Sequence, residues 1–177
     1  MRQPRVCLTG GIACGKSLLS RYLNELGVDT IDADDIVHSI LPAEERARLA
    51  KRAFADAALR KRLEARLHPL VKVRLAAEGE GRLAVIPLLF EAGWDKEYDT
   101  VICVVSTREN QLARMQERRG LTRAEAEARL AAQMPAEEKA ARSHYVIRND
   151  SSAEDLKNEA ARLAAWLKQK KKENENG

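Results

Sequence analysis

Short apolar runs alternate along the chain with longer segments of helical periodicity. Five runs have the length and composition of strands, at 6–9, 28–31, 83–86, 100–105 and 145–147. They lack the alternation of apolar and polar residues that a half-exposed strand shows, which is typical of parallel strands covered by helices on both faces. The pattern therefore predicts a buried, mostly parallel sheet of five strands.

The segments between these runs have the spacing of helices. Leu18, Leu19, Tyr22, Leu23 and Leu26 recur at helical intervals after the first run, and Gly27 ends that helix. Residues 36–75 are helical in pattern, with breaks expected at Pro42 and at His68-Pro69. Residues 108–142 are helical and strongly basic. An apolar stripe after residue 152 predicts a final helix on the sheet, and 168–177 are expected to form a frayed, charged tail.

The order of these elements predicts a doubly wound α/β fold of the phosphate-loop type. With 177 residues the chain fits one domain, 1–177. We expect its core at 1–35, 81–107 and 143–170. A helical insert at 36–80 and a second helical segment at 108–142 interrupt that core.

Composition excludes some classes of function. The net charge is only +4, so charge alone does not indicate nucleic-acid binding, and no aromatic residue interleaves the lysines at 170–172. Three cysteines, at 7, 14 and 103, have neither disulfide nor metal-ligand spacing. No stretch resembles a signal peptide or a membrane span. We therefore expect a cytoplasmic protein with no nucleic-acid partner and no membrane association.

The first apolar run leads directly into a candidate phosphate-binding loop. Residues 10–17 read Gly-Gly-Ile-Ala-Cys-Gly-Lys-Ser, the spacing G-x-x-x-x-G-K-S, between a predicted strand and a predicted helix. Glycines let backbone N–H groups surround a phosphate chain, Lys16 reaches the β- and γ-phosphates, and the Ser17 hydroxyl ligates Mg²⁺. Cys14, near a helix N-terminus, has a position that favours a lowered thiol pKa.

Carboxylates follow the second predicted strand, at Asp32, Asp34 and Asp35. In open α/β sheets ligands bind beyond the carboxyl ends of the strands, on the same edge as the phosphate loop. Asp32 and Asp34 would face opposite sides if the strand continued through them. The alternative is a solvated helix N-terminus, where Asp is common.

The basic segment 108–142 has two interpretations. Gln111, Arg114 and Arg118 share one helix face, and Arg129 and Gln133 form a second short polar row. They are typical of a solvated helical hairpin, and equally of a segment whose arginines clamp a transferred phosphate.

The chain resembles the dephospho-CoA kinases over residues 5 to about 167. N-K-x-D and D-x-x-G sequences are absent, which argues against a GTPase. The resemblance rests on motifs in a fixed order: Leu8-Thr9-Gly10-Gly11-Ile12 with Gly15-Lys16-Ser17, Ile31-Asp32-Ala33-Asp34, Leu67-His68-Pro69-Leu70-Val71, Pro87-Leu88-Leu89-Phe90-Glu91, and Gln111, Arg114, Arg118 and Gln133.

The resemblance implies a nucleotide-binding core, an acceptor-binding insert and a lid at 108–142. The implied reaction transfers the γ-phosphoryl of ATP to the ribose 3′-hydroxyl of dephospho-CoA, giving coenzyme A and ADP, with Mg²⁺ as cofactor. Asp34 matches the catalytic carboxylate, and Lys16, Arg118 and Arg142 are the expected cations at the transferred group.

The resemblance also implies binding residues. The implied ATP contacts are Gly11, Ile12, Ala13, Cys14, Gly15, Lys16, Ser17 and Leu18. The implied acceptor contacts are Asp32, Asp34, His68, Pro87 and Leu88. The implied Mg²⁺ ligands are Ser17 and, through water, Asp32.

Three departures from the family pattern bear on this interpretation. Leu18 stands where relatives carry a small polar residue, and His144-Tyr145 where they carry Ala-Asp. The interval from Asp34 to His68, 34 residues, is shorter than usual. His68 is either a capping histidine between helices or an acceptor contact. A kinase for another small acceptor and a non-catalytic nucleotide-binding protein remain alternatives, and the oligomeric state stays open, a monomer included.

Overall fold

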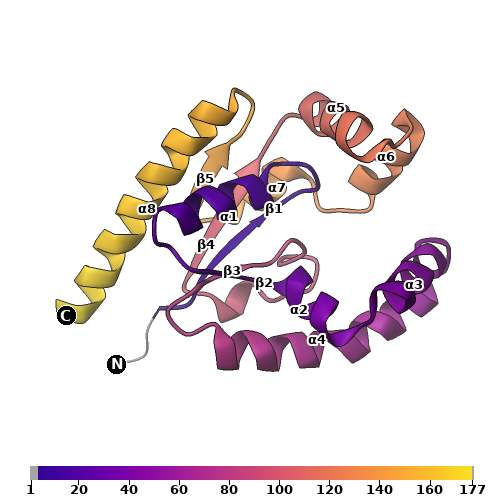
Figure 1. The fold of residues 1–177 in the computed structure, drawn as a ribbon, viewed down its shortest axis with the longest axis horizontal. Helices are drawn as coiled ribbons and strands as arrows, with labels where there is room; N and C mark the ends of the chain where they lie inside the picture. The colour runs from indigo at the N-terminus through magenta and orange to yellow at the C-terminus, as the bar shows by residue number, and fades with distance from the viewer. Residues whose placement is uncertain (1–3, 177) are drawn as a thin grey trace.

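Five parallel strands form the sheet in the computed structural model, which describes residues 4–176 (Figure 1). The strands are β1 (Val6–Gly10), β2 (Thr30–Asp32), β3 (Leu83–Val85), β4 (Thr100–Val105) and β5 (Tyr145–Arg148). Their order across the sheet is β2-β3-β1-β4-β5, and every neighbouring pair is parallel. The predicted doubly wound α/β fold is confirmed.

The middle strand, β1, is where the order of the sheet reverses. The chain first builds outward on one side with β2 and β3, and then on the other side with β4 and β5. Ligands of open α/β sheets bind at such a switch point, beyond the carboxyl ends of the strands. The loop that leaves β1 therefore lies at the position where ligands bind in this class of fold.

Helices connect the strands. Their bounds are α1 (Lys16–Glu25), α2 (Ala33–Ile40), α3 (Ala43–Ala55), α4 (Ala57–Glu78), the short 3₁₀ turn η1 (Asp95–Glu97), α5 (Arg108–Arg119), α6 (Arg123–Ala131), α7 (Ala136–Ala141) and α8 (Ala153–Asn176). Figure 1 shows α1 and α8 together on one face of the sheet, with α3 and α4 on one side of the molecule and α5 and α6 on another. None of the helices within residues 4–176 is both long and apolar enough to span a bilayer.

Two apolar clusters fill the two faces of the sheet. Cys7 and Leu8 are adjacent in β1 and point into different clusters, as alternation along a strand requires. Cys7 packs in the cluster that contains Val71 and Leu75 of α4, and Leu8 in the one that contains residues of α1 and α8. Burial on both faces explains why the strand sequences lack polar alternation.

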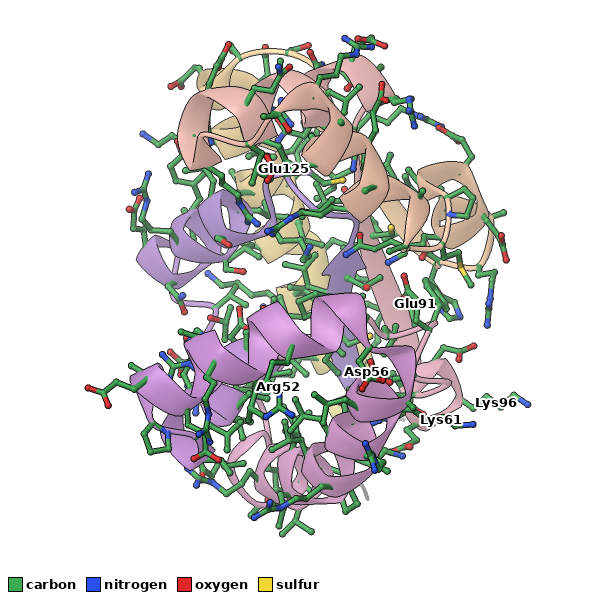
Figure 2. The ribbon with its side chains drawn as sticks, turned by 90° about the vertical axis from the view of Figure 1, so that its right-hand side faces the viewer. Arg52, Asp56, Lys61, Glu91, Lys96 and Glu125 are labelled. Atoms are coloured by element: carbon green, nitrogen blue, oxygen red, sulfur yellow. The ribbon has the colours of Figure 1, made fainter. Side chains whose placement is uncertain are left out.

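The helical insert differs from the sequence prediction at two points. The expected break at His68-Pro69 is wrong, because α4 runs through Pro69 from Ala57 to Glu78. Leu67, Val71 and Leu75 are buried at four-residue intervals across the proline, so packing on the sheet offsets the hydrogen bond that Pro69 cannot donate. The break lies instead at Asp56 (Figure 2), whose Oδ1 accepts from Leu59 N at 2.9 Å and caps α4.

The predicted charged tail at 168–177 belongs to the last helix as far as it is described. Residues 168–176 continue α8, and residue 177 lies outside the described residues. Two short-range contacts to Glu173 support this last part of the helix, an ion pair from Lys170 at 3.4 Å and a hydrogen bond from Gln169 at 3.1 Å. Charged side chains on every face are therefore compatible with a regular helix here.

Candidate active site

The phosphate loop connects β1 to α1 in a conformation that requires glycine at two positions. Gly10 has φ 145° and Gly15, the N-cap of α1, has φ 100°. A Cβ at Gly10 would lie 2.2 Å from Val104 O, and one at Gly15 would lie 2.2 Å from Asn149 Nδ2. Both the backbone angles and the close neighbours exclude larger residues. The loop thus passes against β4 and against the residue that follows β5.

Lys16 is held by the loop itself. Its Nζ donates to Gly10 O at 2.6 Å and to Gly11 O at 3.0 Å. Burial lowers the pKa of Lys16, and Lys139 lowers it further, while Cys14 and Asp34 act in the opposite direction. These carbonyl bonds keep the ammonium group at the mouth of the loop.

Side chains from the lid segment bind the same loop. Gln111 Nε2 donates to Ile12 O at 2.7 Å, Ile12 N donates to Gln133 Oε1 at 2.9 Å, and Arg114 Nη1 donates to Ala13 O at 3.3 Å. Of the polar residues singled out in 108–142, Gln111, Arg114 and Gln133 therefore reach the phosphate loop. An isolated solvated hairpin would make no such contacts.

Asn149, directly after β5, is a loop contact that the sequence did not indicate. Its Nδ2 donates to Cys14 O at 2.8 Å, and its own carbonyl accepts from Ser106 Oγ at 2.9 Å and Arg114 Nη2 at 2.8 Å. Only its place after a predicted strand could have drawn attention to it. The sequence left the state of Cys14 open; in the structure burial raises the pKa of its thiol by more than the charge of Lys16 lowers it.

Two carboxylates stand beside the loop at the start of α2. Asp32 is the N-cap, and its Oδ1 accepts from Asp34 N at 2.8 Å. Because β2 ends at Asp32, Asp34 lies in the first turn of a helix, so the expectation of opposite strand faces does not apply. Burial raises the pKa of Asp32; the bond from Asp34 N lowers it, the charges of Asp34 and Asp35 raise it, and Lys16 lowers it.

These groups line one cavity of about 440 Å³. Its walls combine residues from several segments of the sequence: Ile12, Ala13, Cys14, Gly15, Lys16, Ser17 and Leu18 of the loop and α1, Asp32 and Asp34, Pro87 and Leu88 after β3, Arg114, Arg118 and Arg119 of α5, Gln133, and Asn149, Ser151 and Ala153. The cavity brings one basic wall and one acidic wall together around a phosphate-binding loop. That arrangement can hold a nucleoside triphosphate and present its last phosphate to a second substrate.

Of the predicted site residues, Gly11, Arg142 and His68 do not line this cavity. Arg142 forms an ion pair with Asp95 at 3.0 Å, and its guanidinium lies 4.5 Å from the Phe90 ring centroid. His68 lies within α4, not between helices, and its ring meets Trp94 edge-on at 4.8 Å. Burial lowers the pKa of His68. The roles assigned to all three residues stay predictions.

The chain matches the family model described as dephospho-CoA kinase over residues 5–45 and 43–155. The dephospho-CoA kinase of Geobacter sulfurreducens is 41% identical over 194 residues, covering 91% of this chain and 96% of the relative. That of Anaeromyxobacter dehalogenans is 38% identical over 192 residues, covering 91% and 90%.

Solved structures agree with these matches. A Thermus thermophilus protein has a TM-score of 0.78 at 32% identity, covering 95% of this chain and 98% of the other. The dephospho-CoA kinase from Campylobacter jejuni has a TM-score of 0.66 at 28% identity, covering 98% and 100%.

The family match is interrupted in the helical insert. The two matched segments meet at 43–45, where α3 begins. The alignment with the Geobacter relative is longer than the 177 residues of this chain, so part of that relative has no counterpart here. Both findings agree with the short interval between Asp34 and His68.

Proposed function

The chain belongs to the dephospho-CoA kinase family, which carries out the final step of coenzyme A synthesis, and from this premise we propose how its own residues perform the reaction. The γ-phosphoryl group of ATP passes to the ribose 3′-hydroxyl of dephospho-CoA. The new bond joins that oxygen to phosphorus, the bond to ADP breaks, and the hydroxyl proton leaves to a base. The family relationship carries the overall reaction, and the cavity beside the phosphate loop supports the roles of individual residues.

The phosphate loop and the basic wall bind ATP. Lys16 leaves the carbonyls of Gly10 and Gly11 and contacts the β- and γ-phosphates, where its charge offsets the negative charge of the transferring group. Arg118 lines the cavity from α5 and clamps the same phosphates. Arg114 acts through the loop, because its guanidinium already binds Ala13 O and Asn149 O.

The residues present fit a Mg²⁺ ion. Mg²⁺ in kinases is held by one or two protein oxygens together with substrate phosphates, not by an all-protein cage. Ser17 and Asp32 both line the cavity, and Asp34 lines it beside them, so hydroxyl and carboxylate oxygens of the kind that Mg²⁺ prefers lie together there. Within residues 4–176 no group of three acidic, histidine or cysteine side chains forms a cage of its own. Ser17 and, through water, Asp32 would hold the ion, which would supply positive charge that offsets the charge of the phosphates.

Asp34 is the general base. A ribose hydroxyl is a poor nucleophile at neutral pH, so a carboxylate that accepts its proton and aligns it with the phosphorus lowers the barrier. Asp34 is exposed, and its carboxylate accepts no hydrogen bond from the described residues, whereas Asp32 accepts one from Asp34 N. The structural support for Asp34 is therefore its free position on the acidic wall.

A single observation carries the assignment of the acceptor site: Asp34 lines two cavities at once. The second is a groove of about 480 Å³ between α2, α3 and α4. Apolar side chains of Val37, Leu41, Leu63 and Leu67 line it, along with Arg46. Dephospho-CoA with its ribose at Asp34 extends along this groove, while ATP occupies the first cavity. Pro87 and Leu88 border the ATP side.

A coupled assay of ADP release tests the proposal. Release from ATP and Mg²⁺ is expected only when dephospho-CoA is present, and it is expected to vanish in Lys16→Ala. Release without an acceptor, or undiminished release in Lys16→Ala, would contradict the assigned roles.

The interrupted family match at 43–45 favours one second candidate, a kinase for a different small acceptor. A panel of adenosine-containing alcohols in the same assay separates the two. Faster turnover of a panel member than of dephospho-CoA would support the second candidate.

A further inference from the structure

Lys139 of α7 has no role in the reaction described above, yet its side chain is completely buried. Its Nζ lies 2.8 Å from Glu91 Oε1 and donates to Pro87 O at 3.2 Å. A buried ammonium group is costly unless it is paired, and apolar replacements of buried ion pairs often leave proteins equally stable. A contribution to stability alone therefore does not explain this pair, and its position indicates a second role.

Glu91 holds more than Lys139. The same Oε1 accepts from Met134 N at 3.0 Å. Met134 directly follows Gln133, whose Oε1 accepts from Ile12 N in the phosphate loop at 2.9 Å. Two consecutive residues of the connection between α6 and α7 are thus fixed from two sides, one by the segment after β3 and the other by the phosphate loop.

Lys139 links α7 to the residue that precedes the phosphate loop, through a shared carbonyl acceptor. Pro87 O, which accepts from Lys139, also accepts from Thr9 Oγ1 at 3.4 Å, and Thr9 immediately precedes the phosphate loop. Pro87 lines the ATP cavity. Figure 2 shows Glu91 between the helices of the lid segment above it and the helical insert below it. The pair therefore lies where lid, insert and phosphate loop approach one another.

We propose that Glu91 and Lys139 are positioning residues for ATP: they fix the connection between α6 and α7 so that Gln133 orients the Ile12 peptide of the phosphate loop. Ile12 N–H is engaged by Gln133 Oε1, so Gln133 acts by fixing the loop at Ile12, and the N–H groups of the residues that follow can then point inward together and bind phosphate. Without the carboxylate of Glu91, Met134 N loses its charged acceptor. The position of the neighbouring Gln133 relative to Ile12 is then no longer fixed. Arg142 still attaches this end of the lid through Asp95, so the lid loosens but does not detach.

This inference rests on the proposed binding of ATP at the loop, and its test measures ATP binding directly. ATP with Mg²⁺ is titrated calorimetrically into the wild type, Glu91→Gln, Gln133→Ala and the double variant. Each single change is expected to weaken ATP binding about tenfold, the effect of losing one charge-assisted or well-placed hydrogen bond. The double variant is expected to bind ATP no more weakly than the single variant with the lower affinity, because both changes break the same connection.

Glu137→Gln is the matched control on the same helix. Glu137 forms an exposed ion pair with Arg148 through contacts at 2.9 and 3.0 Å and contacts no part of the ATP cavity. Its loss is expected to leave ATP affinity unchanged.

A second variant guards against loss of folding in Glu91→Gln, which leaves a buried ammonium without its carboxylate. Glu91→Gln/Lys139→Met removes both charges at similar volume. It is expected to melt near the wild-type temperature and still to bind ATP about tenfold more weakly, without further loss on adding Gln133→Ala. The inference would be overturned if Gln133→Ala lowered the ATP affinity of Glu91→Gln/Lys139→Met by a further factor. It would also be overturned if Glu91→Gln/Lys139→Met bound ATP as tightly as the wild type. Absence of ATP binding in the wild type would instead refute the proposed function.

Discussion

The two sides of the active site are built by different means. On the ATP side, four side chains from distant parts of the chain bind the backbone of the phosphate loop: Gln111, Arg114, Gln133 and Asn149. On the acceptor side, mostly apolar side chains line an open groove between α2, α3 and α4, and Arg46, which also lines it, donates to His38 O and Leu41 O.

This difference shows which part of the site needs atoms at fixed positions. A phosphate must meet several N–H groups at fixed positions, so directional hydrogen bonds hold the loop. An acceptor arm that binds through apolar contact tolerates changes in groove length and shape, because hydrophobic burial has no direction. The shortened insert therefore lies on the side of the site that can absorb such a change.

The largest effect is expected where the two sides meet. Asp34→Asn is expected to lower kcat by about 10²- to 10⁴-fold, because an amide cannot accept the proton of the ribose hydroxyl. ATP affinity is expected to stay near wild type, since the phosphate loop is unchanged. Steady-state kinetics and calorimetry measure the two quantities. Asp35→Asn is the matched control, as Asp35 lies outside the ATP cavity. Near-wild-type turnover in folded Asp34→Asn would remove it from the role of base.

A glycine substitution tests the precision of the ATP side. Gly15→Ala is expected to weaken ATP binding at least tenfold, because the new Cβ meets both an unfavourable φ of 100° and Asn149 Nδ2 at 2.2 Å. Gly27→Ala separates the two causes, since Gly27 has φ 79° but no neighbour within 4 Å. That control is expected to lose stability and keep its affinity for ATP. Equal affinities in the two variants would show that the contact with Asn149 is unimportant.

A truncation in the groove tests the tolerance of the acceptor side. Leu63→Ala removes part of the apolar lining and is expected to raise KM for dephospho-CoA about fivefold while KM for ATP stays unchanged. Val73→Ala, on the same helix with Val73 66% exposed, is the control. Initial rates with each substrate varied in turn measure both constants. A shift in the KM for ATP alone would contradict the division into two sides.

The smallest effect concerns the base of the lid. Asp150 Oδ1 accepts from Thr107 N at 2.6 Å, Ser106 Oγ at 2.8 Å and Asn110 Nδ2 at 3.1 Å. Partial burial raises the pKa of Asp150, but these bonds outweigh it and hold the pKa below its ordinary value. A lowered pKa stabilises the fold at neutral pH, and the stabilisation disappears as pH falls through the folded-state value.

Asp150→Asn is accordingly expected to lower Tm by about 2 to 4 °C at pH 7. The difference from wild type is expected to shrink as the pH falls below the ordinary Asp pKa of about 3.9, and to close once the pH has passed the lower folded-state pKa and Asp150 is protonated in both states. Thermal melts across this pH range provide the measurement. A difference independent of pH would show that the charge of Asp150 contributes nothing.

The sequence located the phosphate loop between its strand and its helix because that signal is local. The loop from Gly10 to Ser17 and the strand before it lie within a dozen residues, so spacing alone reveals them. Glu91 was noted only as the end of a family motif, and Asn149 and Lys139 were assigned no role, because the role of each depends on which carbonyl or amide the fold brings near it. The expected break at Pro69 failed for a related reason, since burial of Leu67 and Val71 outweighs the local preference of proline.

The bond between Asn149 and Cys14 joins positions 135 residues apart in the chain. A nascent chain carries the complete phosphate-loop sequence as soon as its first twenty residues exist, but this bond can form only after β5 has been made. The loop therefore takes its final shape late in synthesis, and a chain truncated before residue 149 lacks it. The shape of the phosphate loop in this protein is consequently linked to the arrival of the last strand, although the two lie at opposite ends of the sequence.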